Sequence, residues 1–256
     1  LPEQELVFWR AAFSLPLLVL LVMRARRGWV VQARGVLLLR SVFGFAAMML
    51  FFWSLGRITL GEAQMLIKLQ PVWIALLAPF VLKERPGGRV WWCLGLALCG
   101  AGVVLGPSLT SGVLGVAGLA ALGSSLFSAL AHMQLRKLGR TDPPDLVVFN
   151  FTALLLVFSG VLSIPVARTP ELGHWPVLVG IALCAMTGQM FMTGAYRAAP
   201  APLVAVVGYS AIPVAMFLDG VIWGTVPTVW SIAGGALIIA SGVGLAYAHK
   251  PHRERA

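Results

Sequence analysis

Nine stretches of apolar residues, each long enough to cross a lipid bilayer as a helix, constrain this sequence more than any other feature. A hydrocarbon core of about 30 Å needs roughly 20 residues of helix, because each residue adds about 1.5 Å. The stretches lie at about 6–23, 37–55, 61–82, 90–106, 113–133, 146–166, 176–196, 201–223 and 229–248. The connections between them are too short for a soluble catalytic domain. The sequence therefore predicts an all-α, polytopic membrane protein.

The composition favours the same fold class. Hydrophobic residues make up 59% and charged residues 11% of the 256-residue chain, whereas soluble domains hold about 45–50% and about 25%. The three cysteines, Cys93, Cys99 and Cys184, are odd in number and lie within apolar stretches. This pattern argues against a disulfide framework and against a metal site. We expect neither a metal nor a cofactor.

The basic residues explain the net charge of +10 as a topology signal rather than a nucleic-acid-binding patch. Cytoplasmic connections of membrane proteins are rich in Lys and Arg. The opposite connections hold only Arg57 and Arg168, and Arg10 and Lys68 lie inside predicted spans. The distribution predicts a multi-pass protein of the inner, or plasma, membrane with a cytoplasmic C-terminus. Fifteen of the nineteen basic residues fall on alternate connections: Arg24, Arg26, Arg27, Arg34 and Arg40; Lys83, Arg85 and Arg89; Arg136, Lys137 and Arg140; Arg197; and Lys250, Arg253 and Arg255.

The two halves of the chain resemble each other when one is shifted by 140 residues. This shift predicts a first repeat at 1–107, a second repeat at 112–248 and a basic cytoplasmic tail at 249–256. Because the matching positions fall at equivalent points of equivalent spans, we attribute them to duplication. They include Glu5 with Asp145, Arg57 with Arg197, Gly95 with Gly235 and Gly102 with Gly242.

The second repeat contains five spans and the first contains four, since the span at 113–133 has no counterpart after Leu1. We expect a parent protein of ten helices with a cytoplasmic N-terminus, of which nine helices are visible here. Five is an odd number, so the two repeats would enter the membrane in opposite orientations. Inverted repeats are typical of secondary transporters, which bind substrate near the midplane where the halves meet.

Short motifs follow one another in a fixed order along the chain. The motifs are Phe8-Trp9-Arg10, Leu69-Gln70-Pro71, Leu82-Lys83-Glu84, the glycines at 95, 100 and 102, Pro213, Trp223-Gly224-Thr225-Val226-Pro227 and the run from Gly234 to Gly242. By these motifs the chain resembles the EamA-type, ten-helix branch of the drug/metabolite transporter superfamily. The resemblance implies export or import of small metabolites such as amino acids and their derivatives. This family often has a glutamate after its ninth helix, where this chain has Gly224-Thr225, so no role of that carboxylate is carried over.

Lys68 is the most informative single residue. It lies about 12 Å into its predicted span, and an ammonium at that depth costs roughly 3 kcal/mol. Gln64 shares its helical face. The functional hypothesis is that Lys68 binds a substrate carboxylate or titrates during transport. The alternative is a structural lysine whose ammonium is satisfied by carbonyls and hydroxyls, or one that reaches the interface.

Other polar residues lie near the middle of spans in the second repeat: Asn150, Gln189, Tyr209 and Ser210. Tyr209 is one position from the repeat equivalent of Lys68. These side chains could complete a polar substrate site with Lys68 and Gln64. Each could instead form an ordinary hydrogen bond between helices, worth about 1 kcal/mol.

A gate and two helix kinks are further expectations. Arg10 and Asp219 lie at similar depth, about 6 Å from the outer ends of their spans, and Glu62 is close to that level. We expect Arg10 to pair with one of the two carboxylates as an outer gate, unless all three reach water at the rim. Pro71 and Pro213 each remove a backbone hydrogen bond, which predicts a kink beside a cavity or a tolerated bend.

Two other classes of function compete with a transporter. A membrane-embedded enzyme acting on a lipid-linked substrate would need clustered carboxylates or a His/Asp pair. Here the nine acidic residues are scattered, and the four histidines have no adjacent carboxylate. A channel or a scaffold demands no motif, but neither makes use of an inverted repeat. We predict a carrier, not an enzyme, with a small-molecule substrate, the lipid bilayer as its medium and no nucleic-acid partner. Proton coupling and a monomeric or homodimeric state stay open.

Overall fold

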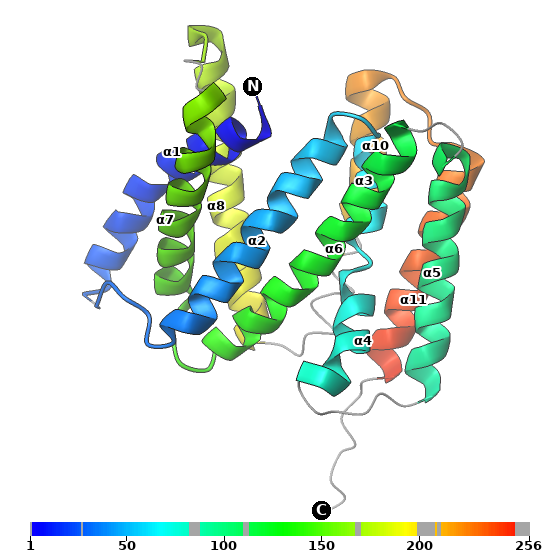
Figure 1. The fold of residues 1–256 in the computed structure, drawn as a ribbon, viewed down its shortest axis with the longest axis horizontal. Coiled ribbons are helices and arrows are strands. Elements are labelled where there is room, and N and C mark those ends of the chain that lie inside the picture. The colour runs from blue at the N-terminus through cyan, green and yellow to red at the C-terminus, as the bar shows by residue number, and fades with distance from the viewer. Residues whose placement is uncertain are drawn as a thin grey trace, which may run out of the picture. The chain divides into compact units, whose positions relative to one another are not determined.

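A computed structural model describes residues 2–26, 28–81, 88–109, 113–166, 170–198, 208 and 211–248. Every regular element in these ranges is a helix (Figure 1). The prediction of an all-α fold is therefore confirmed. The helices are α1 (Glu3–Arg24), α2 (Arg34–Leu55), α3 (Leu60–Ile67), α4 (Gln70–Val81), α5 (Gly88–Leu109), α6 (Val113–Leu138), α7 (Pro144–Ser163), α8 (Trp175–Ala198), α10 (Ala211–Trp223) and α11 (Val229–Ala248), with short 3-10 turns at Ile164–Val166 and Leu172–His174.

The helices have the length and composition of membrane spans. Five of them are long and apolar enough to cross a bilayer, within α1, α2, α6, α7 and α8, and shorter apolar helices lie in α5, α10 and α11. Each side chain that faces lipid must be apolar, which explains why so many large hydrophobic residues are exposed, Trp92 and Phe191 among them. The protein is polytopic, as predicted.

The chain folds as two compact units that do not coincide with the two halves of the sequence. The first unit consists of residues 1–49 and 130–199, and the second of residues 50–129 and 200–256. The boundary between the units falls within α2 and α6. Each unit therefore takes helices from both predicted repeats: α1, α7 and α8 lie in the first, and α3, α4, α5, α10 and α11 in the second.

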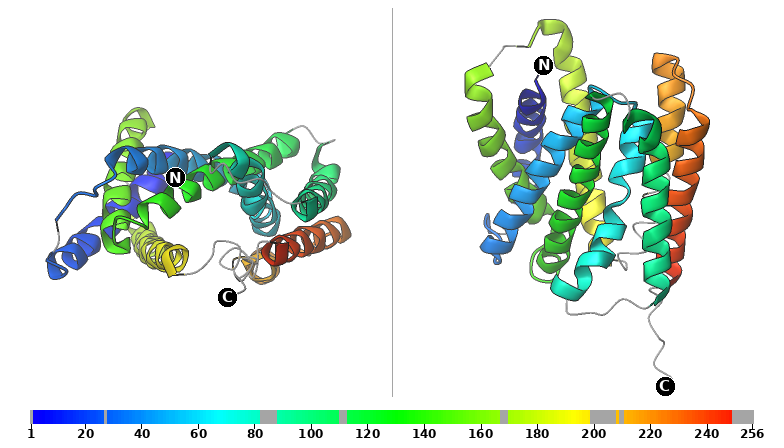
Figure 2. Two further views of the ribbon diagram at one scale, coloured as in Figure 1. Left: turned by 90° about the horizontal axis from the view of Figure 1, so that it is seen from below. Right: turned by 45° about the vertical axis from the view of Figure 1, so that its right-hand side comes forward.

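Within each unit, a helix packs against the helix that the 140-residue shift predicts to be its repeat equivalent. A shift of 140 residues carries the first residue of α1 to within one residue of the start of α7, and it does the same for α5 and α11. Helix α1 packs against α7, and α5 packs against α11, side by side (Figure 2). The colours of Figure 1 show that the two helices of each pair run in opposite directions. This antiparallel pairing supports the inverted-repeat hypothesis.

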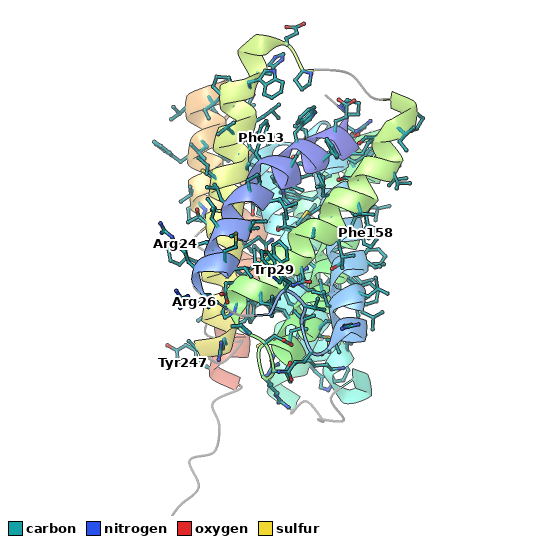
Figure 3. All side chains as sticks on the ribbon, turned by 90° about the vertical axis from the view of Figure 1, so that its left-hand side faces the viewer. Phe13, Arg24, Arg26, Trp29, Phe158 and Tyr247 are labelled. Carbon is teal, nitrogen blue, oxygen red and sulfur yellow. The ribbon has the colours of Figure 1, made fainter. Side chains whose placement is uncertain are left out.

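The first unit is held together by interlocking side chains. Ala11 and Val22 of α1 share a buried core with Val147, Phe151 and other residues of α7. An aromatic cluster joins α1 to the start of α8. In it the ring of Trp175 lies 5.4 Å from Trp9 and 5.7 Å from Phe13, which faces α8 in Figure 3.

The second unit is held together by close contact between backbones. A Cβ atom added at Gly234 of α11 would lie 2.6 Å from the carbonyl oxygen of Gly100 in α5, and one at Gly100 would lie 2.8 Å from that of Gly234. Only glycine permits this approach at both positions. Ser241 donates a hydrogen bond of 2.6 Å to the carbonyl of Cys93 along the same helix pair. The remaining core includes Met65, Leu69 and Ile212.

The predicted span at 61–82 is divided into two helices close to Pro71, where a kink or a bend was expected. Helix α3 ends at Ile67, and α4 begins at Gln70. Pro71 has no N–H with which to reach the carbonyl of Ile67, so the regular hydrogen-bond pattern cannot continue across this point. Both prolines expected to kink helices lie in the first turn of one: Pro71 in α4 and Pro213 in α10.

Candidate functional site

Lys68 lies at the break between α3 and α4. It is the C-cap of α3, and its N–H donates to the carbonyl of Gln64 at 3.2 Å. The neighbouring Leu69 N–H turns back to the carbonyl of Leu66 at 3.1 Å. Lys68 and Gln64 are half-buried, while Leu66 and Leu69 are buried in the core of the second unit. The break thus brings an ammonium and irregular backbone together beside the core.

The predicted repeat equivalent of Lys68 is Gly208, and the two residues lie against each other. A Cβ atom added at Gly208 would lie 3.6 Å from Nζ of Lys68. The ammonium therefore approaches the backbone of the second repeat at the matching position. Tyr209 and Ser210, which we expected to complete this site, lie outside the described residues.

Asp219 and Glu62 bind the N-terminus of α3. The buried Asp219 carboxylate accepts hydrogen bonds from the N–H groups of Leu60, at 3.1 Å, and Gly61, at 2.5 Å. Glu62 and Thr59 form a reciprocal capping box, with both hydrogen bonds at 3.2 Å. A helix N-terminus favours negative charge. These carboxylates therefore fix the start of the short helix that ends at Lys68.

A pocket with a volume of about 580 Å³ lies beside this N-terminus. Its polar lining includes Arg57, Glu62 and Asp219, and its apolar lining includes Trp223. Arg57 packs over the ring of Trp53 at 4.0 Å and donates to the Trp53 carbonyl. Because Arg10 belongs to the first unit, its expected pairing with Asp219 or Glu62 stays a prediction.

The first unit holds the other expected site residues. Asn150 of α7 donates hydrogen bonds of 2.9 Å to the carbonyls of Leu146 and Trp29. This amide therefore fastens the connection between α1 and α2 to α7; Figure 3 labels Trp29 beside that helix. Gln189 of α8 instead faces Arg40, whose Nη2 lies 3.5 Å from its Oε1. A common site of these residues with Lys68 stays a prediction.

Arg40 corrects the assignment of basic residues to connections. It lies inside α2, about 9 Å from the first residue of that helix, and its side chain is 3% exposed. The guanidinium lies over the ring of Phe151 at 4.1 Å. A Cβ at Gly44 would overlap Nη1 of Arg40, so this glycine makes room for the group. Arg40 lies within the predicted span at 37–55, so the sequence could have placed it inside a helix. Counting it with the basic residues of the connections was the error.

Arg10 of α1 is a second cation within the helices of the same unit, and its side chain is half-buried. Its Nη2 lies 2.7 Å from Sδ of Met48. Arg10, Ser14, Phe151, Thr152 and Gln189 line a small pocket with a volume of about 10 Å³, room for about one water molecule. Among the residues described, no three His, Cys, Asp or Glu side chains gather as a metal site would require.

Comparison with known proteins agrees with this architecture. The EamA-like transporter family matches residues 1–106 and 115–247. A solved crystal structure superposes with a TM-score of 0.66 at 20% sequence identity, covering 96% of this chain and 89% of that one. At this identity the likeness shows the fold alone.

Several curated proteins are similar over most of the chain. The pseudopaline exporter CntI of Pseudomonas aeruginosa is 30% identical over 251 residues, 98% of this chain and 88% of that protein. The human solute carrier family 35 member G1 is 28% identical, covering 94% of this chain and 71% of that protein. A riboflavin transporter of Rhizobium johnstonii is 26% identical, covering 94% and 80%. The three are named as an exporter, a solute carrier and a transporter.

Proposed function

The chain belongs to the EamA-like transporter family and is a small-molecule transporter of the membrane, and we propose that it carries small organic metabolites such as amino acids or their derivatives. The transport would be secondary, by alternating access between two inverted repeats. Relatives named for pseudopaline and riboflavin support a small organic substrate. The proposal covers both export and import.

The position of Lys68 is the observation that carries the mechanism. Secondary transporters of this architecture bind substrate where a membrane helix is interrupted and the two repeats meet. Lys68 lies at such an interruption, and Nζ faces Gly208, its equivalent in the other repeat. An ammonium at this point would bind the carboxylate of an anionic or zwitterionic substrate. A change in the backbone conformation between α3 and α4 on substrate binding would then couple binding to movement of the repeats.

The orientation in the membrane follows from the basic residues. Arg24 and Arg26 project from the end of α1 (Figure 3), and Arg136 and Lys137 lie in the last turn of α6. The Gln32 N–H donates to Asp142 at 2.9 Å, which ties the connections that follow α1 and α6 together. These basic residues therefore share one end of the first unit, as a cytoplasmic face in the inner membrane requires. The proposed cytoplasmic C-terminus rests on the alternation of basic connections along the sequence.

Counterflow into liposomes tests the proposal. The purified protein would be loaded with an unlabelled panel of amino acids and derivatives and offered the labelled compounds. We expect saturable exchange that the Lys68→Ala variant loses and that Lys137→Ala retains, because Lys137 is an exposed lysine at the end of α6. Lys68→Arg, which keeps the charge, should retain part of the activity. Exchange that persists in Lys68→Ala would refute the role of this site, and no exchange of any compound would refute the proposed function.

A further inference from the structure

Two arginines of the first unit, the buried Arg40 and the half-buried Arg10, have only weak neutral partners among the described residues. The described contacts of the two guanidinium groups are with a thioether, an amide oxygen at 3.5 Å and an aromatic ring: Met48 for Arg10, and Gln189 and Phe151 for Arg40. Thioether sulfur is a weak acceptor, and 3.5 Å is at the limit of a hydrogen bond. Nε of Arg40 is buried without a hydrogen-bond partner. No carboxylate of the described residues contacts either guanidinium.

This arrangement is costly without an anion. Each guanidinium carries five N–H donors and a charge that proteins do not remove. Arg10 and Arg40 repel each other, and a low-dielectric interior strengthens that repulsion. Buried charges are ordinarily paired, and intramembrane arginines face partners or substrate paths. The fold has nonetheless made room for one of them, because Gly44 and Phe151 shape the space around Arg40.

The surroundings of Arg10 and Arg40 have the other parts of a binding site. The pocket lined by Arg10 also contains the hydroxyl-bearing side chains of Ser14 and Thr152, and Gln189 of this lining contacts Arg40. Ser14 donates to the carbonyls of Arg10 and Ala182, which fixes α1 against α8 at this level. A ligand that contacts both guanidiniums would have to displace Met48 from Arg10 and Gln189 from Arg40, while Phe151 lies over the Arg40 guanidinium. The contacts with Met48 and Gln189 are weak, so a charged ligand could replace them.

We infer that Arg10 and Arg40 form an anion site in the first unit that takes a carboxylate group. The two guanidiniums would each donate to carboxylate oxygens, with Gln189 and Thr152 beside them. This inference deepens the proposed function and rests on it, because it takes the ligand to be the transported substrate. That metabolite would carry a carboxylate that binds these two arginines. The site lies in a different unit from Lys68 and uses none of its residues.

The first test compares two ligands that differ only in charge. N-acetylglycine carries a carboxylate, and N-acetylglycinamide replaces it by a neutral amide of nearly the same shape. Binding of each labelled compound to the purified full chain would be measured at constant ionic strength. We expect saturable binding of N-acetylglycine and at least roughly tenfold weaker binding of the amide, because a charge-assisted hydrogen-bond pair is lost. Equal binding of the two, or binding of neither, would overturn the inference without any variant having to fold.

The second test uses matched arginine variants. Arg40→Gln and Arg10→Gln should each weaken binding of N-acetylglycine at least roughly tenfold, whereas Arg24→Gln should leave it unchanged. Arg24 is exposed in the last turn of α1, so its loss changes net charge equally. An equal loss in Arg24→Gln would show a nonspecific charge effect and refute the site. Arg40→Lys, which keeps a charge in the same place, should bind better than Arg40→Gln.

The outcomes separate the site from the proposed function. Arginine-dependent binding of N-acetylglycine without exchange of any compound into liposomes would uphold the anion site and refute transport. Saturable exchange that Arg10→Gln and Arg40→Gln leave intact would uphold transport and refute the anion site. Loss of both binding and exchange of carboxylates in these variants, with Arg24→Gln unaffected, would support both.

Discussion

Both units contain positively charged side chains among apolar residues, but the surroundings of these charges differ. In the second unit, Lys68 lies where the helix is interrupted, and its ammonium lies beside the backbone of Gly208. In the first unit, Arg10 and Arg40 lie within continuous helices whose backbone groups are already paired, so only side chains surround them. The comparison teaches that an unbroken helix leaves a buried cation to side chains or to a ligand, whereas a broken helix can bind it with backbone.

The main helix pairs of the two units also differ in whether backbones or side chains form the contact. Helices α5 and α11 meet through the backbones of Gly100 and Gly234, whereas α1 and α7 meet through side chains such as Ala11 and Phe151. Gly160 of α7 shows the contrast, because a Cβ there would lie 3.5 Å from the ring of Phe8, an ordinary contact. The second unit is thus built on backbone contacts and the first on side-chain contacts.

The largest expected effect tests this difference in packing. Gly234→Ala places a methyl group 2.6 Å from the Gly100 carbonyl, so α5 and α11 must separate, at a cost of about 1–3 kcal/mol. Gly160→Ala, the control in the first unit, should cost nothing and should gain up to about 1 kcal/mol from helix propensity. Unfolding in mixed micelles titrated with SDS measures both. Equal losses in the two variants would remove the distinction between the units.

The next effect concerns the backbone groups that Asp219 binds. Asp219→Ala leaves the N–H groups of Leu60 and Gly61 without their carboxylate and should cost about 2 kcal/mol. Glu62→Gln is the matched change, because glutamine can keep the capping box, and we expect a loss of under about 0.5 kcal/mol. The same SDS titration measures both variants. A negligible effect of Asp219→Ala would show that α3 does not need this cap.

Much of the fold was predictable from sequence, because about 20 consecutive apolar residues are needed for each span whatever the packing. Among the described residues each of the nine predicted spans overlaps a helix, although the span at 61–82 is divided into α3 and α4. The break at Lys68 was not predictable from hydropathy, since an interrupted helix and a continuous one have the same composition. Arg40 was misplaced because its position near the start of a span resembles that of a connection residue. The contact of Asn150 with Trp29 depends on tertiary packing and leaves no local signal.

A smaller effect is expected in the first unit, where side chains make the polar contacts. Asn150→Leu removes the hydrogen bonds to Trp29 and Leu146 and should cost about 1 kcal/mol. Lipid or apolar neighbours can accept the leucine, but the connection after α1 loses its attachment to α7. Limited proteolysis of this connection, compared with an Asn150→Gln control, reports that change. If cleavage and stability both stay as in the unchanged protein, Asn150 does not hold the connection.

The smallest effect on stability, and the sharpest test of the comparison, concerns two prolines. Pro16 lies inside α1, which stays continuous, whereas Pro71 lies just after a break. Proline alone therefore does not open a helix here, and the break before Pro71 also coincides with the cation at Lys68. Pro71→Ala should change the free energy of unfolding by less than about 0.5 kcal/mol, since proline is tolerated in a first turn. It should nonetheless slow counterflow about two- to fivefold, because a restored N–H can close the break that the transport cycle uses.

Pro16→Ala is the control and should leave the exchange rate unchanged. If both variants slow exchange equally, the break between α3 and α4 has no particular role in transport. The distinction between Lys68 at a helix break and the two arginines in continuous helices would then fail.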